Sequence, residues 1–492
     1  MTTEVLQPGR PSRRLIMLAG ALGLLAVLIA YGMMSVAAGK ATPVSALAVI
    51  VAPAFLVVAL ARPEVAGLAI PGLVFSNAGL VLNESHGIPN VTRFTMLLTL
   101  VLFLVATKWR SRVLVVTPVL WAGFVFVAIR VISAAQAPGA TPNTVATNYA
   151  YGLGIVVVVT AVCSVPLFFR TAGLVVVASA ALVSVGTVAR RNGVGGTWGG
   201  FAGDTPVTSE IAMIENRGGV TIDLASRVAG PVADPNFWAQ ALVFAFPVSL
   251  WALRHRSGWA SRALAVASVV AIVTSLMYTQ SRGGAIAATI GLCVWMWFEG
   301  GRLRKAVWLV PIAAVVALAS SSSASRFTDL QGLFNPKTAA DGSITGRLSE
   351  NLAALQMWQD RPVLGVGADQ YPINYSRYAQ KIGLDSRVGR FAHNSYLQMA
   401  AESGTLGLGA FLGMLITGFV TARRARARLL YAGLHREAGL VTAVMAGGIG
   451  FAVAAVFLHQ AWPDYLWLIL AMIGGAWLMG RRGVDSLDER MA

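Results

Sequence analysis

Charged residues are scarce in this sequence and make up 12% of its 492 positions. A water-soluble globular domain carries roughly 25%, so the chain has too little polar surface to cover a soluble body of its size. Its hydrophobic residues, 56% of the total, gather in long runs of the kind that a bilayer requires. The composition therefore predicts an all-α polytopic membrane protein.

Cysteine and acidic residues are also few. The two cysteines, Cys163 and Cys293, lie inside apolar runs, which argues against a disulfide framework or a thiolate metal site. Acidic residues number 21 against 38 basic ones, giving a net charge of +17. In a membrane protein Lys and Arg gather in cytoplasmic loops, so we expect this charge to lie in such loops and no nucleic acid to be bound.

The apolar runs predict about fourteen candidate spans, or 12–14 transmembrane helices, each near the ~20 residues that cross a bilayer. The third and fourth are short and carry Pro71, Asn77 and Gly79. The first follows a basic N-terminus and is too long for a signal-peptide core, so it is expected to be retained. The spans are expected at 15–37, 43–61, 66–82, 94–107, 114–132, 147–169, 171–188, 235–253, 261–279, 283–299, 305–320, 395–420, 437–459 and 463–479.

Loop charge orients these spans. With both termini in the cytoplasm, one alternation places every short basic cluster inside, at 108–112, 254–256, 302–305, 423–428 and 481–482. A large extracytoplasmic loop then precedes the third-last helix. The expected organisation is N-terminal helices in 1–188, an outer loop at 189–234, central helices in 235–320, the large outer loop at 321–394, and C-terminal helices with a cytoplasmic tail in 395–492.

Several arginines fall on the expected outer side, where the charge rule disfavours them. Arg282 lies in the tight turn TQSRGG, and Arg227 lies in SRVAGPVADPNFWAQ just before a span. Such arginines either anchor lipid phosphates or, where several converge, bind a pyrophosphate bidentately. For Arg130 and the arginines of the large loop we favour the lipid anchor, and for Arg227 and Arg282 both readings stay open. Asp234 or Asn236 has the sequence context of a helix N-cap, which we favour over a catalytic role for Asp234.

One histidine stands where the large outer loop returns to the membrane. His393 opens the stretch HNSYLQMAAESGTLG, whose helix carries Gly404, Gly407, Gly409 and Gly413. Small residues at this spacing let helices approach closely, so we expect the helix inside the bundle. His393 is then either an interfacial residue beside the helix cap Asn394 or a base for a sugar hydroxyl. Before it, apolar residues at helical spacing predict an amphipathic helix at 345–358, lying on the membrane or the bundle.

These motifs resemble a known family. His393-Asn394, followed by nine residues, Gly404, two residues and Gly407, is similar to the His-Asn-x9-Gly-x-x-Gly motif of the O-antigen ligase and polymerase superfamily. GRLSENLAALQMWQDRPVLGVGADQY resembles the loop that precedes this motif, and TQSRGG and RVAGPVADPNFWAQ resemble two further family segments. The likeness covers about residues 220–420.

The resemblance implies a GT-C-like, metal-independent glycosyltransferase without a cofactor, in the bacterial cytoplasmic (inner) membrane with its site outside. The donor would be a polyprenyl-pyrophosphate-linked oligosaccharide, such as one on undecaprenyl pyrophosphate, for cell-surface polysaccharide. The acceptor would be a glycan, lipid or protein. By motif position Arg227 and Arg282 would bind the pyrophosphate, and His393 would act on the acceptor hydroxyl. The supporting residues would be Asn394, Arg347, Arg390 and Asp369.

Other functions remain open at this point. A multispan transporter or flippase for a lipid-linked precursor would place ionisable groups near the midplane on broken helices and often shows repeats. A structural or assembly protein of the envelope would tolerate replacement of His393. The sequence does not separate a ligase from a polymerase, nor does it reveal the acceptor or the sugar.

Overall fold

The computed structural model describes residues 43–194, 200–202, 227–232, 234–311, 342–383, 390–458 and 464–491, with side chains described within 51–485. Every regular element in these ranges is a helix, which confirms the all-α prediction. The N-terminal half contains α2 (Pro43–Ala61), α3 (Pro63–Phe75), α4 (Ala78–His86), α5 (Val91–Val105), α6 (Thr107–Val113), α7 (Pro118–Ala135), α8 (Pro142–Cys163) and α9 (Pro166–Arg191). The remainder contains α11 (Pro235–Arg254), α12 (Trp259–Tyr278), α13 (Arg282–Glu299), α14 (Gly301–Ala306), α18 (Gly342–Asp360), α19 (Tyr371–Lys381), α20 (Ser395–Tyr431), α21 (His435–Ala454), η3 (Ala455–Phe457) and α22 (Asp464–Met491).

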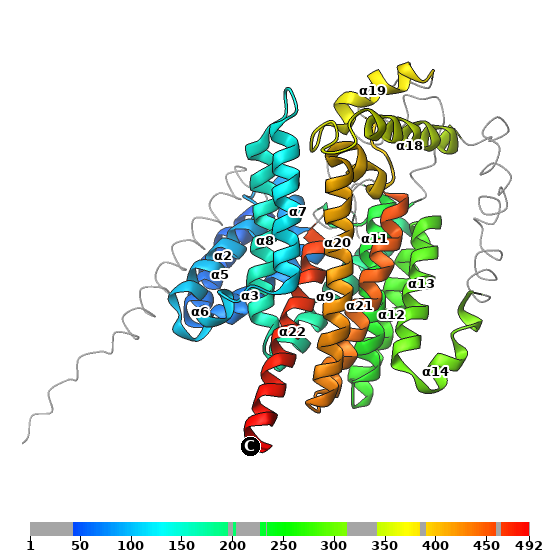
Figure 1. Ribbon diagram of the computed structural model, residues 1–492. Helices are drawn as coiled ribbons and strands as arrows, with labels where there is room; N and C mark the ends of the chain where they lie inside the picture. Colours follow the sequence, from blue (N-terminus) through cyan, green and yellow to red (C-terminus); the bar gives the residue numbers. More distant parts are fainter. Residues whose placement is uncertain are drawn as a thin grey trace, which may run out of the picture.

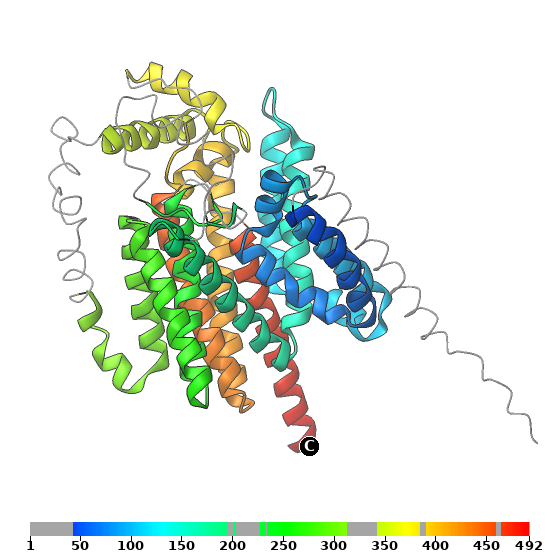
Figure 2. The ribbon, with the colours of Figure 1, turned by 180° about the vertical axis from the view of Figure 1, so that it is seen from behind.

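The helices form two groups joined by the C-terminal helices. Figure 1 shows α2 to α6 on one side, α11 to α14 on the other, and α20, α21 and α22 between them. The contacts agree, because α22 packs on α8, and α21 packs on both α11 and α13. Seen from behind, α9 slants between the two groups (Figure 2). One apolar core therefore extends through helices from both halves of the chain.

The number of membrane helices is smaller in the described residues than the predicted 12–14. Seven helices are long and apolar enough to span a membrane, or nine if two bent pairs each count once. The bent pairs are α3 with α4, at 70°, and α5 with α6, at 112°. They correspond to the predicted spans 66–82 and 94–107, which are thus not single straight helices. Asn77 takes a left-handed φ of 51° at the first bend. The predicted span 15–37 and most of 305–320 lie outside the described residues.

A small helical layer covers one end of the bundle. We call α18, α19 and the turn 361–370 between them the cap; it lies at the top of Figure 1, opposite the basic ends of α20 and α22. The cap has its own core of alanines, tyrosines and a methionine around Ala353, Met357 and Tyr375. The predicted helix at 345–358 is present within α18. However, Leu348 and Leu352 on its expected apolar face are 41% and 39% exposed. The buried face of α18 instead carries Glu350, Ala353 and Met357.

Candidate functional site

His393 lies at the junction between the cap and the bundle. It directly precedes α20, whose N-cap Asn394 accepts hydrogen bonds from the backbone N–H groups of Tyr396 and Leu397 at 3.0 and 3.1 Å. The next side chain, Ser395, donates to the carbonyl of Leu458 at 2.6 Å and ties the helix start to the end of α21 and η3. His393 itself has φ +46°, and its side chain is 17% exposed. The predicted cap role of Asn394 is confirmed.

A buried carboxylate faces His393. Glu350, on α18, is 1% exposed and has its Oε1 atom 3.2 Å from Nε of Arg390. Its Oε2 atom lies 3.8 Å from Nε2 of His393. The Tyr371 hydroxyl donates to the backbone carbonyl of Glu350 at 2.6 Å and holds this turn of α18 in place. Burial, and then the Glu350 charge, raise the pKa of Tyr371, so the phenol stays a neutral donor.

The helix after His393 is broken, and the break receives the cap. Gly404 has φ 64° and ψ −164° inside α20, a conformation that is essentially confined to glycine. The turn 361–370 runs into this break, where the N–H groups of Val366 and Gly367 donate to carbonyls of Ala401 and Glu402 at 2.9 and 3.0 Å. The N–H of Thr405 donates to the Pro362 carbonyl at 2.7 Å. A Cβ at Gly404 would strike the backbone of Val363.

Arg130 is buried beside this break, so its interpretation as a lipid anchor was wrong. Its guanidinium, 0% exposed, donates to Glu402 at 2.7 Å and to Asp369 at 2.8 Å. It also donates to the hydroxyls of Tyr149 and Ser403 at 3.0 Å each. Arg130 therefore joins α7 and α8 to α20 and the cap turn. A buried guanidinium needs such partners, because an uncompensated charge away from water is strongly destabilising.

Arg227 is bonded to the turn between α12 and α13, and Arg282 directly follows this turn. Arg227 donates through Nε to the Thr279 carbonyl at 2.9 Å and through Nη2 to Asn236 at 3.1 Å. Arg282 is the first residue of α13, which begins one position earlier than predicted and is capped by Ser281. The predicted helix N-cap at Asp234 is confirmed, since the Asp234 side chain accepts a hydrogen bond from the backbone N–H of Asn236 at 2.6 Å, at the start of α11.

Contacts place both arginines at the same end of the bundle as His393. Gly283, beside Arg282, lies against the Phe457 ring, which a methyl group there would approach to 2.7 Å. Phe457 precedes Leu458, whose carbonyl accepts the Ser395 hydroxyl two residues after His393. The start of α13, the end of α21 and η3, and the start of α20 are thus adjacent. Arg282 and His393 thus lie on adjacent elements, and Arg227 is bonded to the turn just before Arg282.

The supporting residues take different places. Arg390 pairs with Glu350, beside His393. Asp369 instead joins the Arg130 cluster, with its side chain 45% exposed. Arg347 lies on α18, one helical turn before Glu350, and is partly buried.

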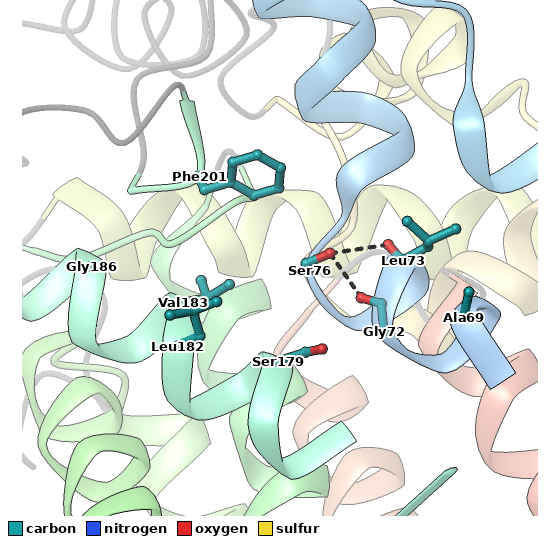
Figure 3. Close-up of a pocket in the computed structure, with 9 residues that line it drawn as sticks. All are labelled: Ala69, Gly72, Leu73, Ser76, Ser179, Leu182, Val183, Gly186 and Phe201. Carbon is teal, nitrogen blue, oxygen red and sulfur yellow. Dashed lines mark hydrogen bonds between the residues drawn. The ribbon is translucent and has the colours of Figure 1, made fainter. Parts of the chain in front are cut away.

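A separate cavity of about 390 Å³ lies between α3 and α9, with Phe201 at its edge (Figure 3). Its lining is mainly apolar, and the Ser76 hydroxyl is turned to the Gly72 carbonyl at 2.8 Å. None of the predicted site residues lines it. Its lining side chains cannot move a proton at ordinary pH, so the cavity is not where transfer chemistry would occur.

A protein-family comparison gives the geometry a context. Residues 267–412 match the family described as O-antigen ligase. Residues 267–412 are therefore similar to this family, and we call them the O-antigen ligase region. A search of curated proteins finds no match to the chain. The O-antigen ligase region runs from within α12 into α20 and contains Arg282, Glu350 and His393, whereas Arg227 and Arg130 precede it.

Sequence reasoning missed two buried carboxylates near this site, Glu350 and Glu402, and it assigned Arg130 to the lipid rather than to a buried ion pair. Glu402 had a detectable signal, since a lone carboxylate inside a long apolar run requires a partner. Glu350 had none, because one acidic residue in a mixed loop helix is ordinarily solvated.

Proposed function

We propose that this protein transfers a glycan from a polyprenyl-pyrophosphate-linked donor to a hydroxyl acceptor at the capped end of the bundle. The membrane helices and the O-antigen ligase region support the general class. The observation that carries the proposal is the adjacency of the α12–α13 turn to the start of α20 with His393. Arg282 follows this turn directly, and Arg227 is bonded to it through Thr279. Those are a phosphate-binding pair and a base at one end of a membrane bundle.

In the proposed reaction, Arg227 and Arg282 hold the pyrophosphate. The acceptor oxygen attacks the anomeric carbon while the bond from that carbon to the phosphate oxygen breaks. The pyrophosphate leaves with the electron pair, and His393 takes the proton of the acceptor hydroxyl. Fixed guanidinium groups stabilise the charge that develops on the leaving group. The direct displacement inverts the anomeric carbon, and the proposal includes no metal ion or cofactor.

The proposed location is the outer face of the cytoplasmic membrane, with both termini inside. The cap and the basic carboxyl ends of α20 and α22 lie at opposite ends of the bundle. Basic residues near membrane helices favour the cytoplasm, so the cap end would face outward. A donor displayed on the outer leaflet would then meet the arginines without crossing the membrane.

The transporter alternative has one feature in its favour, the break in α20 beside buried charges. This break is filled by the chain itself, because the cap turn bonds to both sides of it. The buried charges are likewise paired with one another. The break therefore holds the cap in place rather than offering an obvious ion or substrate position.

The test is glycan transfer by His393→Ala and Arg282→Ala, in membranes that carry the native lipid-linked glycan. Both variants should lose high-molecular-weight product and accumulate lipid-linked donor at wild-type protein level. His255→Ala is the matched control, because His255 bonds to the Trp251 carbonyl at the end of α11. Wild-type transfer by His393→Ala would reject a base at this position and favour the structural alternative. Product length in the wild type separates a polymerase from a ligase.

A further inference from the structure

We infer that Glu350 is a positioning residue that stabilises the protonated form of His393 during transfer, with Arg390 fixing the Glu350 carboxylate. This inference rests on the proposed function and assigns a role to a residue on α18, a different element from the one that carries the histidine. Three observations carry it: the burial of the carboxylate, the division of its two oxygens, and the backbone of His393.

The Glu350 side chain is 1% exposed, so its charge is poorly screened by water. An ionised carboxylate in such a place requires a cationic partner, and Arg390 supplies one at 3.2 Å on Oε1. That pair alone balances the charge. The other oxygen is directed at the imidazole of His393, 3.8 Å away. Of Arg390 and His393, which both lie beside this carboxylate, only the histidine can change its charge near neutral pH.

The 3.8 Å separation is longer than a hydrogen bond but within the range of a strong charge interaction. Nδ1 of His393 is enclosed by the protein. Nε2, the nitrogen nearer to Glu350, is thus the one to receive the acceptor proton. In the step, the acceptor O–H bond breaks, an N–H bond forms at Nε2, and the new positive charge appears beside the carboxylate. A negative charge within about 4–6 Å of an imidazole favours its protonated form tenfold or more.

The backbone at His393 is consistent with this placement. A positive φ of 46° is uncommon outside glycine, although histidine is among the residues that adopt it more often. Such conformations persist where the surrounding structure enforces them, and they gather at functional sites. Here Asn394 and Ser395 anchor the chain on one side, and Arg390 anchors it to Glu350 on the other. The imidazole is thereby held against the carboxylate.

The experiment compares Glu350→Gln and Glu350→Asp in the same transfer assay, with kcat and donor KM measured separately. Glu350→Gln keeps the shape and removes the charge, so kcat should fall roughly tenfold or more while the donor KM is unchanged. Glu350→Asp keeps the charge and should restore part of kcat. The matched control is Glu437→Gln, which removes a similarly buried carboxylate, 3.2 Å from Arg170, at the start of α21.

A double mutant separates this role from a structural one. In a His393→Ala background, Glu350→Gln should cause no further loss, because its effect acts through the imidazole. A further loss equal to that in the wild type, or a raised donor KM with normal kcat, would overturn the inference. So would normal activity of Glu350→Gln. If His393→Ala itself transfers normally, the proposed function fails instead, which is a different outcome from normal transfer by Glu350→Gln alone.

Discussion

Arg130 and Glu402 are 272 residues apart in the chain, yet their side chains meet at 2.7 Å and neither has any exposed surface. Glu402 lies two residues before Gly404, where α20 breaks. Its other carboxylate oxygen accepts a hydrogen bond from the Gln398 side chain at 2.9 Å. The N–H of Asp369 also donates to the Glu402 carboxylate, at 3.2 Å. Arg130, Glu402 and Asp369 thus join α7, the broken helix and the cap turn, and so help to set the position of His393, which directly precedes this helix.

We expect Arg130→Met to be strongly destabilising. It leaves the Glu402 carboxylate buried without its cation, which typically costs about 3–5 kcal/mol. The thermal unfolding midpoint of the purified protein in detergent should fall clearly. Adding Glu402→Gln should recover part of the loss, because the uncompensated charge is then removed. Arg62→Met is the control, because the Arg62 side chain is 74% exposed and its ion pair with Glu64 is long, at 3.7 Å. Equal midpoints for the Arg130 and Arg62 variants would show that the ion pair does not hold the cap.

Gly404→Ala should also destabilise the protein and reduce transfer. The backbone conformation alone is unfavourable for alanine by about 1–3 kcal/mol, and the new methyl group would strike the Val363 backbone. Gly409→Ala, five residues further along α20, meets nothing within 4 Å and should be neutral or slightly stabilising. The same unfolding measurement compares the two. A Gly404→Ala variant as stable as Gly409→Ala would contradict the assigned break.

Local signals predicted the membrane class and the starts of α11 and α20. Asp234 and Asn394 were identified as caps because capping involves residues two or three positions apart. The break at Gly404 was not predicted. The glycines of α20 were interpreted as a surface for close helix approach, and Gly404 instead provides a left-handed backbone into which the turn 361–370 inserts. Only the tertiary structure shows which glycine has which role.

Long-range pairing accounts for the remaining differences. Arg130 lies near a helix end, where a lipid anchor is the common case, and nothing near it in sequence announces Glu402. Its burial follows from the packing of α7 against α20. The sequence grouped Arg227, Arg282 and His393 only through the resemblance to a family. In the structure, the start of α13 and the start of α20 are linked by contacts with Phe457 and Leu458, and neither residue type indicates such a link in the sequence.

The buried face of α18 leads to a contrast between two kinds of substitution. Leu348→Ser with Leu352→Ser should change the free energy of unfolding little, within about 0.5 kcal/mol per site, because both side chains are well exposed. Met357→Ala should cost about 2–5 kcal/mol, since Met357 is fully buried in the cap core. Limited proteolysis of the cap and thermal unfolding would measure this. If the double leucine variant were instead the less stable of the two, Leu348 and Leu352 would lie on the packed face of α18.

Arg227→Lys tests whether the arginine is needed for its shape as well as its charge. Arg227 is fixed by bonds to Thr279 and Asn236, and a lysine cannot reproduce this two-armed geometry. Under the proposed function, the donor KM should rise at least about tenfold, which equals 1.4 kcal/mol of lost binding. Asn236→Ala removes the bond that Arg227 donates through Nη2 and should produce a smaller rise in the donor KM.

Arg93→Lys is the control for Arg227→Lys, because Arg93 also bonds to an asparagine, Asn148, but near the start of α5. It should leave the donor KM unchanged. Unfolding midpoints of both variants must be compared first, since the Arg227 bonds also hold the segment before α11 against the α12–α13 turn. A normal donor KM for Arg227→Lys would remove the guanidinium fork from donor binding. A raised donor KM with an unchanged unfolding midpoint would support binding of the pyrophosphate at the α12–α13 turn, at the same end of the bundle as His393.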